Sequence, residues 1–207
     1  MRIALTMRIT EAPGTAELRD AISHDWLARF AAWEMTPVPV PNILAQPEAY
    51  LDGLGVDLLV LTGGDDLGVT PARDATESRL LAHAVGKGLA VLGVCRGMQL
   101  INHHLGGRLS RIDDHVACSH GIAVEPVWRD LYDGRTTVNS FHALGIPADG
   151  LAEGLAAAAF DSAGHVEAFH HRTKPLAGVM WHPERPDAPE EDLRLIGRLT
   201  AEGAFWT

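Results

Sequence analysis

Two short apolar segments, each running into a glycine-containing turn, constrain the fold of this chain most strongly. Asp57–Leu61 (D-L-L-V-L) leads into Thr62-Gly63-Gly64, and Ala90–Val94 leads into Cys95-Arg96-Gly97. Segments this short and apolar are typical of parallel strands buried on both faces. Helices are expected after them over Ala75–Val85 and Gly97–Leu105, because each of these stretches is closed by glycine. Alternating strands and helices predict a doubly wound α/β sheet with right-handed crossovers.

The rest of the chain extends this sheet. A first strand is expected over Ile3–Thr6, a helix over Arg19–Trp33 and a short or edge strand around Val38 and Val40, where prolines alternate with valines. Short strands are expected later over Ile122–Val127, Thr136–Ser140, Leu155–Phe160, Val166–Phe169 and Leu176–Met180, before a last helix over about Glu190–Thr200. The prediction is one domain spanning residues 1–207: an open, mostly parallel sheet flanked by helices, with extra antiparallel strands in the second half.

The net charge and the composition of the chain limit the kinds of partner that it can bind. The formal net charge of −10 in 207 residues disfavours nucleic acid, because an acidic chain repels a phosphate backbone. No apolar stretch approaches the ~20 residues that cross a bilayer, so no membrane partner is expected. Two cysteines in a chain of this length do not form a disulfide framework. The expectation is a reduced, cytoplasmic protein.

Cys95 lies where the second apolar strand meets its helix, in Gly93-Val94-Cys95-Arg96-Gly97. A nucleophile on such a turn is forced outward at the carboxyl ends of the strands, and the tight turn leaves no room for Cβ atoms at the glycines. The helix N-terminus behind the sulfur favours a thiolate and can hold an oxyanion. A buried, unreactive cysteine is the common alternative. The flanking glycines favour the nucleophile.

A base and an orienting group for this thiol occur together in Trp181-His182-Pro183-Glu184. In extended chain, residues two apart point to the same face, so the Glu184 carboxylate can fix the tautomer of the His182 imidazole. Taken alone, this pair is more typical of a solvated turn than of a catalytic site. Together with Cys95, it predicts a catalytic triad.

These residues resemble three motifs of the class I (triad) glutamine amidotransferases. In the family's order, Leu61–Asp66 is similar to the glycine loop, Gly93–Gln99 to the nucleophile elbow and Trp181–Glu184 to the His–Glu segment. The resemblance implies an open mixed sheet flanked by helices, with attack of Cys95 on a γ-glutamyl carbonyl and a thioester intermediate. It also implies backbone oxyanion-hole donors at Gly64 and Arg96, and a contact to the glutamyl group from Gln99.

The segment V-N-S-F-H narrows the resemblance to free-standing hydrolases. It resembles the V-N-S-x-H segment of the γ-glutamyl-γ-aminobutyrate hydrolase group, which binds the amino and carboxylate ends of the glutamyl group. The implied substrate contacts are Asn139, Ser140, Phe141 and His142. That group usually continues with His-Gln, where this chain has Ala143-Leu144, and this departure puts the aminobutyrate half of the substrate in doubt.

The N-terminal part is similar to the short γ-glutamyl-CDP-amidate hydrolases, which act in making capsule phosphoramidate groups. The similar segments are Thr6–Ile9, Leu18–Ile22 and Asp25-Trp26. A diphosphate substrate needs cations, and Arg8, Arg172 and Lys174 are candidates, with solvated surface positions as the alternative. The expected reaction is hydrolysis of γ-glutamyl-CDP-amidate to glutamate and CDP-amidate, with γ-glutamyl-γ-aminobutyrate as the second candidate substrate.

Two rival functions remain open. One is a glutaminase subunit that passes ammonia to a synthase, against which the V-N-S-F-H segment speaks. The other is a catalytically silent protein on the same scaffold, which has no physical reason to keep a cysteine, histidine and glutamate set.

No metal and no cofactor are expected. His115, Cys118 and His120 lack the paired spacing of a structural zinc site and predict a polar loop instead. The expected partner is a small-molecule γ-glutamyl substrate. Trp26 and Trp33 lie seven residues apart on one helical face and are expected to pack in the core or in an interface rather than to bind a base. A homodimer also remains open.

Overall fold

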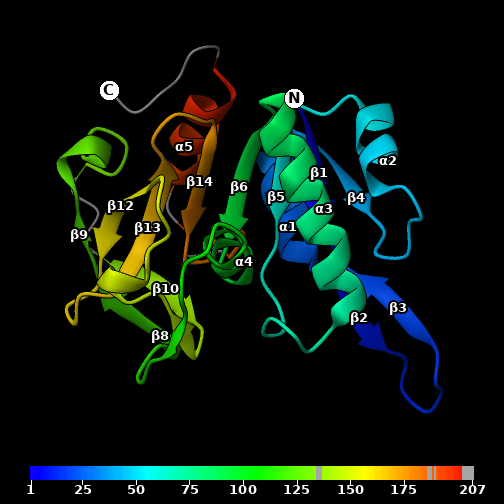
Figure 1. Cartoon of the computed structure of the whole chain (residues 1–207), viewed down its shortest axis with the longest axis horizontal. Helices are drawn as coiled ribbons and strands as arrows, with labels where there is room; N and C mark the ends of the chain where they lie inside the picture. Colours follow the sequence, from blue (N-terminus) through cyan, green and yellow to red (C-terminus); the bar gives the residue numbers. More distant parts are fainter. Residues whose placement is uncertain (134–136, 186–187, 189, 202–207) are drawn as a thin grey trace.

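The computed structural model describes residues 1–133, 137–185, 188 and 190–201, and one large β-sheet forms its centre (Figure 1). Among these residues the sheet has eight strands, in the order β4-β1-β5-β6-β14-β13-β12-β9. They are β4 (Thr36–Val40), β1 (Arg2–Thr6), β5 (Leu58–Leu61), β6 (Ala90–Val94), β14 (Leu176–Val179), β13 (Val166–His171), β12 (Leu155–Phe160) and β9 (Ala123–Val124). The first five are parallel neighbours, and the last three are paired antiparallel. The prediction of a mostly parallel sheet with antiparallel strands from the second half is confirmed.

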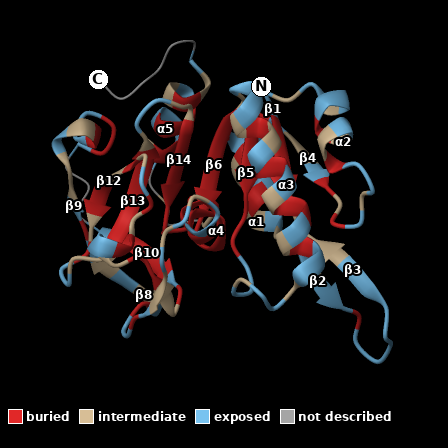
Figure 2. Cartoon of the chain, viewed as in Figure 1, coloured by how far each residue is buried: buried red, intermediate tan, exposed pale blue. Residues whose placement is uncertain are grey.

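Helices cover both faces of the sheet. They are α1 (His24–Ala32), α2 (Pro47–Leu54), α3 (Pro71–Lys87), α4 (Arg96–His104) and α5 (Glu191–Thr200). Alternate side chains of β5 enter opposite cores: Leu58 and Val60 pack with α1 and α5, while Leu59 and Leu61 pack with α2, α3 and α4. Burial on both faces explains why this strand is apolar throughout. Figure 2 shows the buried sheet between helices whose outer faces are exposed.

Three two-stranded sheets and two short 3-10 helices complete the described structure. The pairs are β2 (Arg8–Glu11) with β3 (Leu18–Ala21), β7 (Ser110–Arg111) with β11 (Leu144–Gly145), and β8 (Val116–Gly121) with β10 (Thr137–Phe141); the 3-10 helices are η1 (Pro126–Trp128) and η2 (Ala148–Gly150). We call the β8–β10 pair the ribbon. It lies at the end of the sheet where β6 runs into α4 (Figure 1).

The helix predicted over Arg19–Trp33 is wrong at its N-terminal end. Leu18–Ala21 instead pairs antiparallel with Arg8–Glu11, and the helix starts only after Ser23. The Ser23 backbone is extended, and its Oγ accepts a hydrogen bond of 3.2 Å from the N–H of Asp25. Serine in this position caps a helix and marks its first turn.

Other boundaries differ for local reasons. The strand expected over Ile122–Val127 is cut to Ala123–Val124, because Pro126 begins a 3-10 helix. Thr136, the expected first residue of another strand, lies outside the described residues. The edge strand around Val38 is confirmed, since β4 closes one side of the sheet. Helix α2 and strand β8 were not predicted.

Two further findings bear on partners. Trp26 and Trp33 pack in the core, 3% and 9% exposed, so the core alternative is confirmed for both. Among the described residues, no helix combines the length and the apolar character that crossing a bilayer requires.

Candidate active site

Cys95 occupies the predicted sharp turn between β6 and α4. Its backbone has φ 51° and ψ −106°, a conformation that costs a side-chain-bearing residue free energy and is found mainly at functional sites. A Cβ at Gly97 would lie 2.0 Å from the carbonyl oxygen of Leu61, and one at Gly93 would lie 2.7 Å from the Gly97 backbone. Both glycines are therefore required by close packing, as the sequence predicted.

Strand β14 brings His182 beside this turn. It is the parallel neighbour of β6, and the N–H of Cys95 donates a 2.8 Å hydrogen bond to the carbonyl of Val179. His182 follows three residues later, with its Nδ1 2.8 Å from Oε1 of Glu184. Both side chains are buried. The predicted pairing of His182 with Glu184 is present in the structure.

The glycine loop after β5 closes the third side of the site. A Cβ built on Gly63 would lie 3.0 Å from Cε1 of His182 and 3.7 Å from Cβ of Cys95. The three motifs, which are far apart in the sequence, therefore meet at the carboxyl ends of β5, β6 and β14.

The electrostatics of His182 reflect its two neighbours. Burial disfavours its charged form, but interactions with the Cys95 thiol and the Glu184 carboxylate outweigh burial and raise the pKa of His182 to about 10. Its Nε2 is buried and forms no hydrogen bond of ordinary geometry with the described residues. The thiol contact is therefore looser than a hydrogen bond, as is common in enzymes without substrate. Nε2 is the nitrogen left to exchange a proton, because Nδ1 is held by Glu184.

A buried arginine supports the glycine loop. Nη2 of Arg73 donates to the carbonyls of Thr62 and Gly63 at 2.7 and 3.1 Å, and its Nε donates to Glu77 at 2.9 Å. Gly64 has φ +143°, and a Cβ there would lie 2.4 Å from Nη1 of Arg73. Hydrogen bonds from the Arg73 side chain thus fix the loop, and glycine is the only residue that fits at position 64.

The side chain of Arg96 belongs to the same hydrogen-bonded network as Arg73 and Glu77. Its guanidinium is ion-paired with Glu77 and Asp74 of α3 and is 1% exposed. The backbone N–H of Arg96 lies in the first turn of α4, where N–H groups have no partner within the helix. The network escaped the sequence analysis because the predicted helix began at Ala75. With α3 starting at Pro71, Arg73 and Glu77 form an i, i+4 pair that the sequence could have revealed.

Four of the five predicted glutamyl contacts have side chains that are engaged within the protein. Asn139 donates to the carbonyl of His182 at 3.2 Å and accepts from its N–H at 2.8 Å. The hydroxyl of Ser140 donates to the carbonyl of His115 at 2.7 Å, and Nε2 of Gln99 donates to that of Leu144 at 2.9 Å. Asn139 therefore holds the backbone of His182 in place, and substrate contacts by these residues stay a prediction.

The other predicted contacts differ in exposure. Phe141 is 41% exposed, and its ring stands edge-on to His182 with the ring centroids 5.4 Å apart. The guanidinium of Arg185, which the sequence analysis missed, lies 4.8 Å from the centroid of the same ring. His142 is buried, and its Nδ1 lies 3.0 Å from the carbonyl of Leu144. Phe141 and Arg185 thus form an accessible wall next to His182.

The three candidate phosphate-binding cations separate in space. Arg8 is exposed, and its Cβ would lie 3.7 Å from a Cβ on Gly64, which places it beside the glycine loop. Arg172 and Lys174 follow β13, which runs antiparallel to β14, so they lie at the opposite edge of the sheet from His182. The candidacy of Arg172 and Lys174 is therefore wrong, because the antiparallel turn carries them away from the site.

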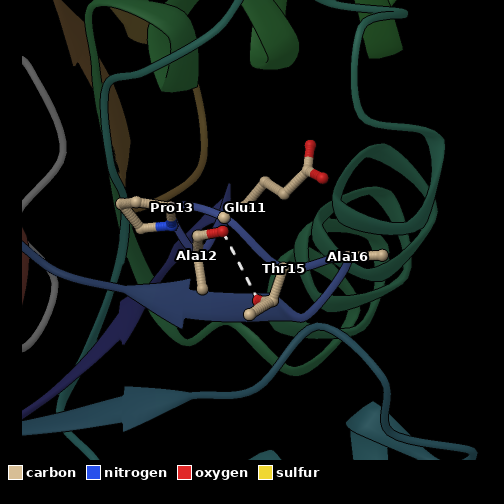
Figure 3. Close-up of a pocket in the computed structure, with 6 residues that line it drawn as sticks. Glu11, Ala12, Pro13, Thr15 and Ala16 are labelled. Carbon is tan, nitrogen blue, oxygen red and sulfur yellow. Dashed lines mark hydrogen bonds between the residues drawn. The ribbon is translucent and has the colours of Figure 1, made fainter.

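Among the hollows of the described surface, one touches the triad and another is remote from it. A cavity of about 230 Å³ adjoins Glu184 and is lined by Asp25, Ala28, Arg29, Ala32 and Glu184. A more open hollow lies at the tip of the β2–β3 hairpin (Figure 3) and is lined by Glu11, Ala12, Pro13, Gly14, Thr15 and Ala16. The hydroxyl of Thr15 donates to the carbonyl of Ala12 there, at 3.5 Å. This second hollow belongs to the hairpin turn alone and holds no member of the triad.

One group of side chains in the described part of the chain has the chemistry of a metal site. His115, His120 and Glu167 present ligand atoms that all lie within 4.8 Å of one another. Cys118 is not a member, since its thiol donates to the carbonyl of Asp114 at 3.2 Å.

Comparison with known proteins agrees with this geometry. The model of the Peptidase C26 family matches residues 6–184. The chain is 26% identical over 194 residues to the gamma-glutamyl-CDP-amidate hydrolase of Campylobacter jejuni, covering 89% of this chain and 90% of that protein. It is 34% identical over 179 residues to the glutamine amidotransferase-like protein YvdE of Lactococcus lactis, covering 72% of this chain and 75% of that protein.

Solved structures share the fold. A crystal structure described as that of a GMP synthase protein from Thermoplasma acidophilum superposes with a TM-score of 0.70 at 21% identity, covering 97% of this chain and 92% of that one. A glutamine amidotransferase from Thermotoga maritima gives a TM-score of 0.63 at 16% identity, covering 88% and 76%. Motifs, fold and family match agree, and the chain belongs to the Peptidase C26 family of class I glutamine amidotransferase-like γ-glutamyl hydrolases.

Proposed function

We propose that the protein hydrolyses a γ-glutamyl amide through a thioester on Cys95. The observation that carries this proposal is the meeting of three features at one edge of the sheet. Cys95 sits in a strained turn, His182 is held by Glu184 at 2.8 Å, and the Gly63–Gly64 loop packs against both. Each feature alone has a structural explanation, but together they supply a nucleophile, a base and an oxyanion site.

The reaction proceeds in two balanced halves. The thiol proton of Cys95 passes to Nε2 of His182 before the attack, which the raised pKa of His182 favours. The thiolate then attacks the γ-carbonyl carbon, and the carbonyl oxygen becomes an oxyanion. As this intermediate collapses, the carbon–nitrogen bond breaks and His182 returns the proton to the leaving nitrogen. Water then attacks the thioester carbon and gives a proton to His182. The carbon–sulfur bond breaks, and His182 passes that proton to the sulfur of Cys95. The products are glutamate and a free amine or amidate.

Backbone N–H groups of Gly64 and Arg96 stabilise the oxyanion in this proposal. Removing one such donor typically costs about 2.7–4 kcal/mol of transition-state stabilisation. Arg73 and Glu77 would contribute indirectly, because they fix the loop and the helix that carry the two donors.

The preferred substrate that we propose is γ-glutamyl-CDP-amidate, with CDP-amidate as the product. Support comes from the named Campylobacter relative, which this chain matches over nearly its whole length. A second support is charge in a chain whose net charge is −10. Arg8 lies beside Gly64, and Arg185, which also pairs with Asp25 at 3.6 Å, packs on the Phe141 ring next to His182. Such cations suit a diphosphate leaving group better than the single carboxylate of aminobutyrate.

A panel of substrates tests this proposal. Glutamate release is measured with γ-glutamyl-CDP-amidate, γ-glutamyl-γ-aminobutyrate and glutamine, using wild type, Cys95→Ala and the matched control Cys118→Ala. We expect turnover of the CDP-amidate that Cys95→Ala abolishes and Cys118→Ala retains. Turnover of γ-glutamyl-γ-aminobutyrate alone would refute the substrate but keep the mechanism. Glutamate release that survives in Cys95→Ala would refute the mechanism.

A further inference from the structure

A second cluster of ionisable side chains lies beside the proposed active site, and the reaction above does not use it. We call it the histidine cluster: His115, His120, His142 and Glu167. Its members come from the two strands of the ribbon, or the residues next to them, and from β13. The His115 and His120 rings are 4.4 Å apart between centroids, and those of His115 and His142 are 5.2 Å apart.

The three imidazoles are held in the same way, each through its Nδ1. In each ring Nδ1 lies within hydrogen-bond distance of a backbone carbonyl. The pairs are His115 with Asp113 at 2.7 Å, His120 with Gly121 at 3.1 Å, and His142 with Leu144 at 3.0 Å. A carbonyl only accepts, so Nδ1 carries the hydrogen and Nε2 presents its lone pair. Backbone carbonyls fix the ring orientation of metal-binding histidines in this way.

The free nitrogens converge on a buried carboxylate. Nε2 of His120 lies 3.6 Å from one oxygen of Glu167, and Nε2 of His142 lies 3.9 Å from the other. Glu167 is 1% exposed, and within the described residues neither its oxygens nor the three Nε2 atoms have a hydrogen-bond partner. Lone pairs of neutral rings facing a carboxylate repel one another unless a proton or a cation lies between them.

The surroundings argue for a cation. His115, His142 and Glu167 are all buried, with exposed fractions of 9%, 5% and 1%. Within the described residues, the ion-pair contacts of Glu167 are to the histidines alone, and no lysine or arginine pairs with it. A buried carboxylate without such a partner is costly. A bound divalent ion would supply the missing positive charge.

We propose that Nε2 of His115, Nε2 of His120 and the Glu167 carboxylate bind one divalent transition-metal ion of the Zn²⁺ class. Two imidazoles and a carboxylate are ligands that Zn²⁺ accepts at about 2.0–2.2 Å, which places ligand atoms about 3.4 Å apart in tetrahedral geometry. The three present atoms lie within 4.8 Å, so closure requires movements of about 1 Å. Nε2 of His142, which lies 3.9 Å from Glu167, could supply a fourth ligand.

Asp161 offers the competing arrangement. Its Oδ2 lies 3.2 Å from Nε2 of His115 and 2.8 Å from Nδ1 of His165. Without metal, His115 can share a proton with Asp161, and Glu167 can stay protonated. In the metal-free state Nε2 of His115 faces Asp161, whereas in the metal-bound state it would join His120 and Glu167 around the ion.

The metal would brace the part of the ribbon that holds the catalytic base. The carbonyl of His115 accepts hydrogen bonds from the Ser140 hydroxyl at 2.7 Å and from the N–H of His142 at 3.0 Å. Between these residues and the base, Asn139 holds both backbone groups of His182. The proposed ion is therefore structural, and its binding does not depend on the proposed substrate.

Metal binding to the full chain tests the inference. The background is Cys95→Ser, which removes the thiolate as a ligand, and the protein is stripped with a chelator before titration with Zn²⁺ by calorimetry. The variants are His120→Ala, His120→Asn and Glu167→Gln, and His104→Ala is the control because His104 is exposed on α4. Circular dichroism confirms that each variant is folded.

We expect one ion per chain, with a dissociation constant that rises at least about 100-fold in the His120 and Glu167 variants, since even loss of an outer-shell partner costs 10–100-fold. The His104 control should match the parent. Co²⁺ should give the visible bands of a four- or five-coordinate nitrogen and oxygen site, without thiolate charge transfer. Absence of binding, or binding that the His120 and Glu167 variants leave unchanged, would overturn the proposal.

Discussion

Replacing Asn139 with alanine separates a positioning role from a substrate-binding role. The Asn139 amide makes two buried hydrogen bonds to the backbone of His182, at 2.8 and 3.2 Å. Its loss orphans one donor and one acceptor, each costing about 1–3 kcal/mol, so the free energy of unfolding should fall by about 2–6 kcal/mol if no water replaces the side chain. The His182 ring should also lose its fixed orientation toward Cys95.

Urea unfolding and steady-state kinetics measure the two consequences. A positioning residue predicts a fall in kcat with little change in KM, because the ground-state contacts of the substrate are intact. The control is Ser119→Ala, which changes an exposed ribbon residue directly opposite Asn139 in register. A raised KM with unchanged kcat and stability would refute the positioning role and favour direct glutamyl binding, as the family resemblance implies.

Three further predictions follow from geometry and charge. In Cys95→Ala, the pKa of His182, about 10 in the wild type, should fall when followed by NMR; an unchanged value would show that the thiol does not act on the ring. Gly97→Ala should destabilise the fold by several kcal/mol in urea, because its Cβ would lie 2.0 Å from a backbone oxygen, whereas Gly86→Ala, in open space within α3, should stabilise it by about 0.5–1 kcal/mol. Burial, followed by the charge of Asp161, raises the pKa of Glu167 from 4.5 to about 8, so the metal-free protein should lose stability as pH rises through this window, by up to about 1.4 kcal/mol per unit. Glu167→Gln should remove that slope, and a retained slope would assign it to another group.

The central strands and the nucleophile turn could be predicted because their signals are local. An apolar run of four or five residues followed by a glycine-containing turn, as in β5 and β6, indicates burial on both faces and a sharp turn after the strand. The strain at Cys95 and the packing of Gly97 against Leu61 follow from the same few residues. Such features depend little on distant parts of the chain.

Other features depended on contacts that the sequence does not reveal locally. Leu18–Ala21 continues the apolar spacing of the following helix, but pairing with β2 makes it a strand. Glu167 lies far along the chain from the ribbon, so no spacing rule connects its carboxylate with His120. The misplacement of Arg172 has the same origin, since the direction of β13 decides which edge of the sheet it reaches.

Mass spectrometry of an acid-quenched reaction tests the central claim most directly. The protein is mixed with γ-glutamyl-CDP-amidate or γ-glutamyl-γ-aminobutyrate, quenched within the first turnovers and digested. The account predicts a transient gain of one glutamyl group on the peptide that contains Cys95, which is lost with hydroxylamine and absent from Cys95→Ala. Glutamate release without any adduct on that peptide, or with an adduct on another residue, would contradict it.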